Sequence, residues 1–170
     1  MIFNAAGSLM NLPTSVWLFQ SLHALGMALW LSIAVRNNWR GFAGSAFAVG
    51  GTMSMAPLRV DPAIDTPLLS RAIRSIALHR VALGVVLALQ LAAALAFWAG
   101  SVMLVVGGDL AAARPWLNLG LAGFAAFLFA MHLGGLWFGY WIRQEGLQLT
   151  HLVLLLWVLA AFFLFNLPWH

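Results

Sequence analysis

The sequence predicts an all-α membrane protein: a four-transmembrane-helix bundle with a long loop between the first and second helices. Two observations support this fold class. Of the 170 residues, 64% are hydrophobic and only 7% are charged, whereas a soluble domain draws about 25% of its residues from Asp, Glu, Lys and Arg. The apolar residues also form long continuous runs, unlike the alternating pattern of membrane barrels. One transmembrane domain, residues 1–170, is expected at this length.

Four segments reach the length of about 20 residues that a helix needs to cross a bilayer. The first covers residues 13–35 and is expected to be retained, because residues 1–11 lack the basic start of a signal peptide. The second, residues 77–106, ends at the turn signal Gly107-Gly108-Asp109. The third covers residues 115–142 and the fourth 147–167, with Pro13 and Pro115 in first turns, where helices tolerate proline. Interfacial aromatics are expected near the ends: Trp17, Trp98, Trp116, Trp137, Trp141 and Trp169.

The arginines set the expected orientation. With four spans, residues 36–76 and 143–146 lie on one side of the membrane, and both termini lie with Arg114 on the other. Cytoplasmic loops are enriched in basic residues. We therefore expect the loop 36–76 to be cytoplasmic and both termini to be periplasmic, in a bacterial inner (cytoplasmic) membrane. The arginines expected on the cytoplasmic side are Arg36, Arg40, Arg59, Arg71, Arg74, Arg80 and Arg143.

The long loop has two parts. Gly41 to Met55 is uncharged and too short to span, which favours an interfacial or re-entrant stretch. Three prolines then predict an irregular piece, before a helical start leads into the second span. The leading interpretation is anchoring to lipid headgroups by arginine, with the loop as a lid over the bundle. The alternative is a docking surface for a partner.

Composition argues against several function classes. The net charge of +4 comes from arginines between apolar segments, not from the continuous basic footprint that nucleic-acid binding needs. The chain has no cysteine, which removes thiol catalysis and Cys-ligated metals. The predicted spans contain no Asp, Glu or Lys, the usual relay groups of transporters and channels. The acids lie in loops or at helix ends, so hydrolytic catalysis has no candidate, and enzymatic activity is not the leading expectation.

Each predicted helix carries one histidine beside another polar residue or a glycine. Inward histidines on two helices are how membrane cytochromes b hold haem. At about 1.5 Å per residue, His79 and His151 are expected in the shallow cytoplasmic layer, His132 roughly 10 Å into the span, and His23 near the middle. The leading interpretation is hydrogen bonding across helices. The alternative is a haem b or quinone site with these candidates: His132 with His79 or His151, His23 as a deeper polar group, and Arg74 or Arg80 for a propionate or quinone oxygen.

Gly135 and Gly139 have the small-xxx-small spacing of helix-packing motifs. Close packing inside the bundle is its ordinary meaning. Homodimerisation is the alternative use.

Several stretches resemble one family. Asn37-Asn38, Ser45 to Phe47, Met53 to Met55 and Arg71 to His79 are similar to the bacterial "predicted small integral membrane protein" family, domain of unknown function 2165, as is Gly135 to Trp141 with Gln144 to Gln148. The resemblance covers about residues 15–165 and implies four helices in this order, without an established activity. The chain departs from the family pattern at Gly51 or Thr52, where a histidine is expected, and at Leu136, where an acid is frequent.

A shorter stretch, His23 to Trp30, is similar to the first helix of copper-resistance membrane domains and of bacterial haem-binding protoporphyrinogen oxidases. Their later histidines have spacings that this chain does not reproduce. Two functions stay open. The leading one is a non-catalytic accessory or anchor subunit, with the lipid bilayer and another membrane subunit or itself as partners. The alternative is a redox subunit that binds haem b or quinone.

Overall fold

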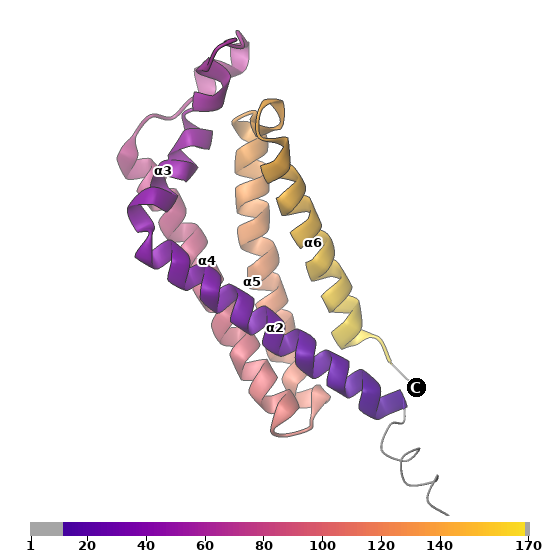
Figure 1. Ribbon diagram of the computed structural model, residues 1–170. Coiled ribbons are helices and arrows are strands. Elements are labelled where there is room, and N and C mark those ends of the chain that lie inside the picture. Colours follow the sequence, from indigo (N-terminus) through magenta and orange to yellow (C-terminus); the bar gives the residue numbers. More distant parts are fainter. Residues whose placement is uncertain (1–11, 169–170) are drawn as a thin grey trace, which may run out of the picture.

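The structure, a computed structural model, describes residues 12–168. Residues 1–11, which lack the basic start of a signal peptide, and Trp169 lie outside the described residues. Four long apolar helices dominate the described chain (Figure 1), and each is long and apolar enough to cross a membrane. They are α2 (Leu12–Arg40), α4 (Ile76–Val105), α5 (Leu110–Trp137) and α6 (Glu145–Asn166). The predicted all-α four-span bundle is confirmed.

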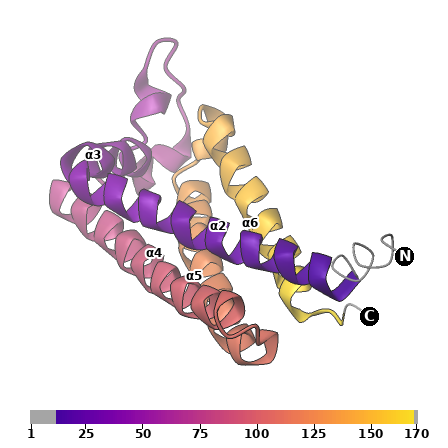
Figure 2. The same ribbon diagram turned by 60° about the horizontal axis from the view of Figure 1, so that its bottom comes forward.

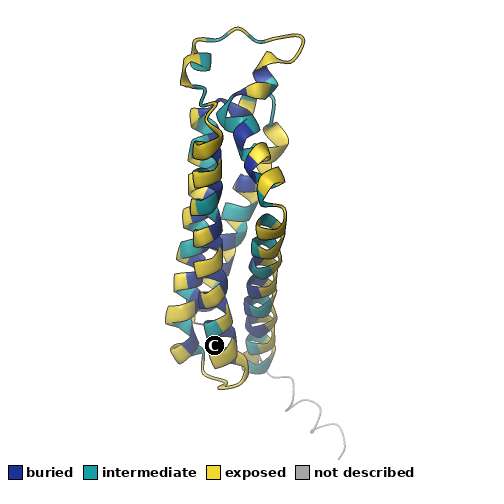
Figure 3. Cartoon of the chain, turned by 90° about the vertical axis from the view of Figure 1, so that its left-hand side faces the viewer, coloured by how far each residue is buried: buried dark blue, intermediate teal, exposed yellow. Residues whose placement is uncertain are grey.

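The bundle is built on the antiparallel pair α4 and α5. Helix α6 packs on α5, and α2 crosses the bundle obliquely, as Figure 2 shows. The core between them is apolar and includes Met27, Leu31, Phe97, Phe124 and Phe165, each fully buried. Buried residues line the inner faces of the helices, whereas exposed residues cover the outer faces (Figure 3). Those outer faces carry large apolar side chains throughout, as expected for helices surrounded by lipid.

The two ends of the bundle differ. One end carries the short helix α3 (Phe42–Met53) (Figure 1). The same end also carries three 3-10 turns: η1 (Ala56–Arg59), η2 (Pro67–Arg71) and η3 (Tyr140–Ile142). The other end carries the α4–α5 turn and the described chain ends. At that turn Gly108 takes a left-handed φ of 63°, and the Asp109 side chain accepts a hydrogen bond of 3.0 Å from the amide of Ala112. Asp109 thus caps α5.

Three helix ends differ from those predicted. Helix α2 runs to Arg40 rather than to residue 35, because nothing breaks the helix before Gly41. Helix α5 begins at Leu110, which leaves Pro115 inside the helix, beyond the first turn, rather than at the start. It ends at Trp137 rather than at residue 142, because Gly139 takes a φ of 68° and starts the separate turn η3.

The stretch 42–53 is helical. Helix α3 buries Ala46 and Gly50 against the beginning of α4. We call residues 54–75 the cap. The cap has a small core of its own, in which Met55 and Leu58 pack with Phe138, just beyond the end of α5. The piece expected to be irregular is therefore fixed by apolar burial and by backbone bonds such as Ile73 N–H to Met53 O, 2.8 Å.

Candidate functional site

Three aromatic rings meet near the cap end of α5 and α6. The hydroxyl of Tyr140 and Nδ1 of His132 are hydrogen-bonded at 2.6 Å. The His151 ring stacks on the Tyr140 ring, with centroids 5.9 Å apart and planes at 24°. The centroids of the two imidazoles are 6.4 Å apart. We call these residues the His-Tyr-His cluster. His132 and His151 thus lie at the same level, whereas the sequence placed His151 shallower.

Two glycines position the tyrosine of this cluster. A Cβ on Gly135 would lie 2.6 Å from ring carbons of Tyr140, closer than any ordinary contact. The left-handed φ of 68° at Gly139 turns the chain back, so that Tyr140 reaches the space beside Gly135. The spacing of Gly135 and Gly139 therefore serves a turn within one chain in this structure. Their use in packing between copies of the chain stays a prediction.

Two of the three cluster residues are almost closed to solvent, whereas His132 is half-buried. Tyr140 is 2% exposed and His151 is 5% exposed. Burial raises the pKa of the Tyr140 phenol, because desolvation disfavours the phenolate. Within the described chain, Nδ1 of His151 is buried without a hydrogen-bond partner. An orphaned buried nitrogen is costly, so it marks the cluster as a candidate site.

The cluster also bears on the haem hypothesis. Tyr140 is about as far from His132, 6.0 Å between ring centroids, as from His151, 5.9 Å. The centroid of the phenol ring therefore lies close to the plane that bisects the line between the two imidazole centroids. A porphyrin held between these histidines would occupy that same plane. Binding haem here thus requires Tyr140 to leave its bond with His132.

His79 belongs to a different part of the molecule. Its Nε2 is 2.9 Å from the carbonyl oxygen of Ile73, and its ring lies so close to Gly50 that a Cβ there would collide with Nδ1. His79 lines a groove of about 730 Å³ between α3 and the start of α4, together with Arg74 and Arg80. Three of the predicted cofactor residues therefore meet here, away from the His-Tyr-His cluster.

His23 lies deeper in the bundle. Trp157 of α6 donates its indole N–H to Nε2 of His23 at 2.9 Å. The rings of Phe19 and Phe165 lie 5.8 and 6.1 Å from the imidazole, measured between centroids. This bond joins α2 to α6 and satisfies the polar nitrogen, as buried polar groups in membrane helices require.

Other polar side chains also join helices. The side-chain amides of Asn118 and Asn166 form two hydrogen bonds with each other, of 2.9 and 2.8 Å. The amide of Asn38 donates to Gln90 at 3.0 Å and accepts from Ser45 at 3.2 Å. These pairs link α5 to α6, and α2 to α3 and α4.

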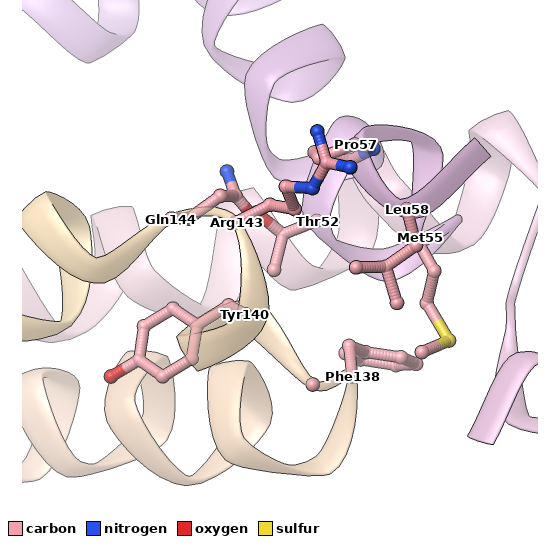
Figure 4. Close-up of a pocket in the computed structure, with 9 residues that line it drawn as sticks. Thr52, Met55, Pro57, Leu58, Phe138, Tyr140, Arg143 and Gln144 are labelled. Atoms are coloured by element: carbon pink, nitrogen blue, oxygen red, sulfur yellow. The ribbon is translucent and has the colours of Figure 1, made fainter. Parts of the chain in front are cut away.

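A second hollow lies between the cap and η3 and is shown in Figure 4. Met55, Leu58 and Phe138 line its apolar side, while Arg143 and Gln144 line the other. It leaves no room for a water molecule. The Tyr140 side chain points away from the apolar group (Figure 4). This hollow is a packed joint between the cap and the bundle.

Two features of the candidate sites were not predicted from the sequence. Tyr140 was not singled out, although it is the chain's single tyrosine and follows His132 by eight residues. Its place depends on the turn at Gly139, which the continuous apolar pattern conceals. The groove was also missed, because it needs α3 to be a helix. The uncharged run from Phe42 to Met53 was the available signal.

Comparison with known families gives one match. A family model described as "Predicted small integral membrane protein" (domain of unknown function 2165) covers residues 16–168. Comparisons with curated proteins and with solved structures find no match.

Proposed function

Since the chain belongs to the family of predicted small integral membrane proteins, domain of unknown function 2165, we propose that it is a non-catalytic accessory or anchor subunit of a larger membrane complex. The observation that carries the proposal is the built cap. A mere linker between two spans needs no core, yet Met55, Leu58 and Phe138 are at most 8% exposed. Fixing such a segment costs about 1–2 kcal/mol of backbone entropy per residue, so an ordered cap favours a defined surface.

The tip of the cap is the proposed contact with the partner. Val60 is 61% exposed, and Asp61 and Asp65 are also exposed. The guanidinium of Arg143 donates to the carbonyl oxygen of Pro62 at 2.6 Å, which holds the tip against the α5–α6 connection. An exposed apolar residue beside carboxylates on a fixed segment suits a specific protein contact.

The arginine distribution supports a cytoplasmic cap in a bacterial inner membrane, with the chain ends periplasmic. Seven of the eight arginines lie at the cap end, within the ends of spans or between them, and Arg114 lies at the other end. The positive-inside rule then places the cap in the cytoplasm. The proposed partner is a membrane subunit with a cytoplasmic surface.

The test is purification of the tagged full chain from its native membrane in a mild detergent. We expect a stoichiometric second membrane polypeptide in an assembly well above the 18.4 kDa of one chain. The double variant Val60→Lys/Asp65→Lys should lose that polypeptide. The matched control Glu145→Lys reverses an exposed charge at the same end and should keep it. An assembly that contains only this chain, or that survives the tip variant, contradicts the proposal.

A redox subunit that binds haem b or quinone is the second candidate. It is supported by the approach of His132 and His151 from neighbouring spans and by Nδ1 of His151, which has no partner among described residues; for haem it requires Tyr140 to leave its bond with His132. Its test is the visible spectrum of protein from a haem-supplied host, before and after dithionite, with solvent extraction for quinone. A Soret band that is lost in His132→Ala and kept in His23→Ala supports haem. A featureless spectrum and an empty extract refute this candidate.

A further inference from the structure

The groove between α3 and the start of α4 combines two kinds of surface. Figure 1 shows α3 running beside the first turns of α4. The groove volume of about 730 Å³ falls in the range of small-molecule pockets, about 300–1,000 Å³. Its apolar wall includes Phe47 and Ile76, which are 82% and 72% exposed. Its basic wall includes Arg59, Arg74 and Arg80.

The basic wall lacks counter-charges. Arg59 and Arg74 have no hydrogen-bond, ion-pair or ring partner within residues 12–168. Arg80 has only the face of Phe42, 6.0 Å from the guanidinium carbon to the ring centroid. No carboxylate is among the described side chains that line the groove. Three guanidinium groups around one hollow therefore favour an anion, and guanidinium binds phosphate through paired N–H donors.

The apolar wall indicates that the anion carries an apolar tail. Ile76 and Arg80 stand in the first turns of α4, at the end of a span, so the arginines lie at the level of lipid headgroups. Phe47 belongs to α3, which is uncharged along its length. A free phosphate needs no such surface. Basic pockets beside spans on the cytoplasmic side of a membrane are typical sites for anionic lipid headgroups.

Two glycines of α3 shape the groove. Gly50 lets α3 approach His79, because a Cβ at this position would collide with the imidazole. Gly51 lines the groove, and a Cβ there would meet no atom within 4 Å. A larger side chain at position 51 would therefore project into the hollow without disturbing the contact between α3 and α4.

We propose that this groove is a binding site for one anionic phospholipid, with its phosphate on Arg59, Arg74 and Arg80 and an acyl chain along Phe47 and Ile76. The site shares Arg59 and Arg74 with the cap, but its walls are α3 and the start of α4, whereas the proposed partner contact is formed by Val60, Asp61 and Asp65. It can therefore be occupied whether or not the proposed partner exists.

The test uses delipidated full-length protein and measures binding by native mass spectrometry. Phosphatidylglycerol should bind with one-site stoichiometry, whereas phosphatidylcholine of the same chain length and inorganic phosphate should not. The double variant Arg59→Gln/Arg74→Gln should bind phosphatidylglycerol at least about tenfold more weakly, since a charged hydrogen bond is worth a factor of this order. Arg36→Gln/Arg40→Gln removes the same charge outside the groove and should bind as the wild type does.

A second pair of variants leaves every charge in place. Gly51→Leu should weaken binding by projecting into the groove, where it would take space from the lipid. Gly44→Leu adds the same side chain to α3 where space is equally open but outside the groove lining, and should leave binding unchanged. Equal binding of phosphatidylcholine, binding of phosphate alone, or full binding by Gly51→Leu overturns the proposal. This pair decides the question if the arginine variant does not fold.

Discussion

Replacing Gly135 with alanine should destabilise the protein, whereas the same change at the adjacent Gly134 should not. A Cβ at Gly135 would lie 2.6 Å from two ring carbons of Tyr140, so the ring must retreat by roughly 1 Å to reach an ordinary contact. A Cβ at Gly134 would meet no atom within 4 Å. Both positions lie in the last turn of α5, which makes the two variants a matched pair.

The magnitude follows from what holds the tyrosine. Overpacking of a tight site costs about 1–3 kcal/mol. Moving Tyr140 also lengthens its 2.6 Å bond to His132, and a lost hydrogen bond costs about 1 kcal/mol. Alanine in place of glycine in a helix returns about 1 kcal/mol. We expect Gly135→Ala to lose about 1–3 kcal/mol of unfolding free energy, and Gly134→Ala to gain up to about 1 kcal/mol.

The assay is unfolding of detergent-solubilised protein by a graded denaturing detergent, followed by tryptophan fluorescence. A second readout follows the tyrosine directly. The chain has a single tyrosine, so phenolate absorbance during an alkaline titration reports Tyr140 alone. Burial raises its pKa, and Gly135→Ala should move that pKa back toward the ordinary value. If Gly135→Ala is as stable as Gly134→Ala and titrates as the wild type does, the proposed seating of Tyr140 is refuted.

Three further predictions concern other parts of the molecule. Asn118→Ala and Asn166→Ala should each lose about 1–2 kcal/mol of unfolding free energy, because the two side chains share two hydrogen bonds. A double-mutant cycle should give a coupling energy near 1 kcal/mol, and additive losses would contradict this prediction. The folded protein holds the Tyr140 proton more tightly than the unfolded chain does. The unfolding free energy should therefore fall as pH rises from about 10 through the pKa of Tyr140 in the folded state. An unfolding free energy that stays constant across this pH range would contradict the burial of the Tyr140 phenol. The chain has no cysteine, so single cysteines can report the orientation. Asp65→Cys should react with an impermeant maleimide only after spheroplasts are opened, whereas Ala112→Cys should react in intact spheroplasts. The reverse pattern would mean that the orientation is inverted.

The four spans could be predicted because hydrophobicity in long runs is a local property. Helix ends depend on finer chemistry. The start of α5 is set by the Asp109 side chain, which caps Ala112, and this signal competes with a proline signal at Pro115. The end of α5 is set by the left-handed turn at Gly139, which the apolar residues around it hide.

The candidate site was only partly predictable, because its contacts join residues far apart in sequence. The pairing of His132 with His151 was one of two expected alternatives, and their depths were estimated from predicted ends that differ from those of the structure. A lid over the bundle was expected, but its core could not be predicted, since Met55 packs on Phe138 across more than eighty residues. Spacing along one helix carries no information about such partners.

The polar groups of the molecule fall into two sets, which locates its unexplained chemistry. Several arginines are bound within the chain: Arg114 donates to the carbonyl of Phe165 at 2.9 Å, and Arg71 lies 4.6 Å from the Trp137 ring centroid. Arg59 and Arg74 have no side-chain partner in residues 12–168, as is also true of Arg36 and Arg40, but they differ from those two in facing one groove. Packing accounts for the first set. The side chains of Arg59 and Arg74 make no contact in residues 12–168 that would hold the fold, and the proposed anion at the cap end of the bundle would give both of them a partner.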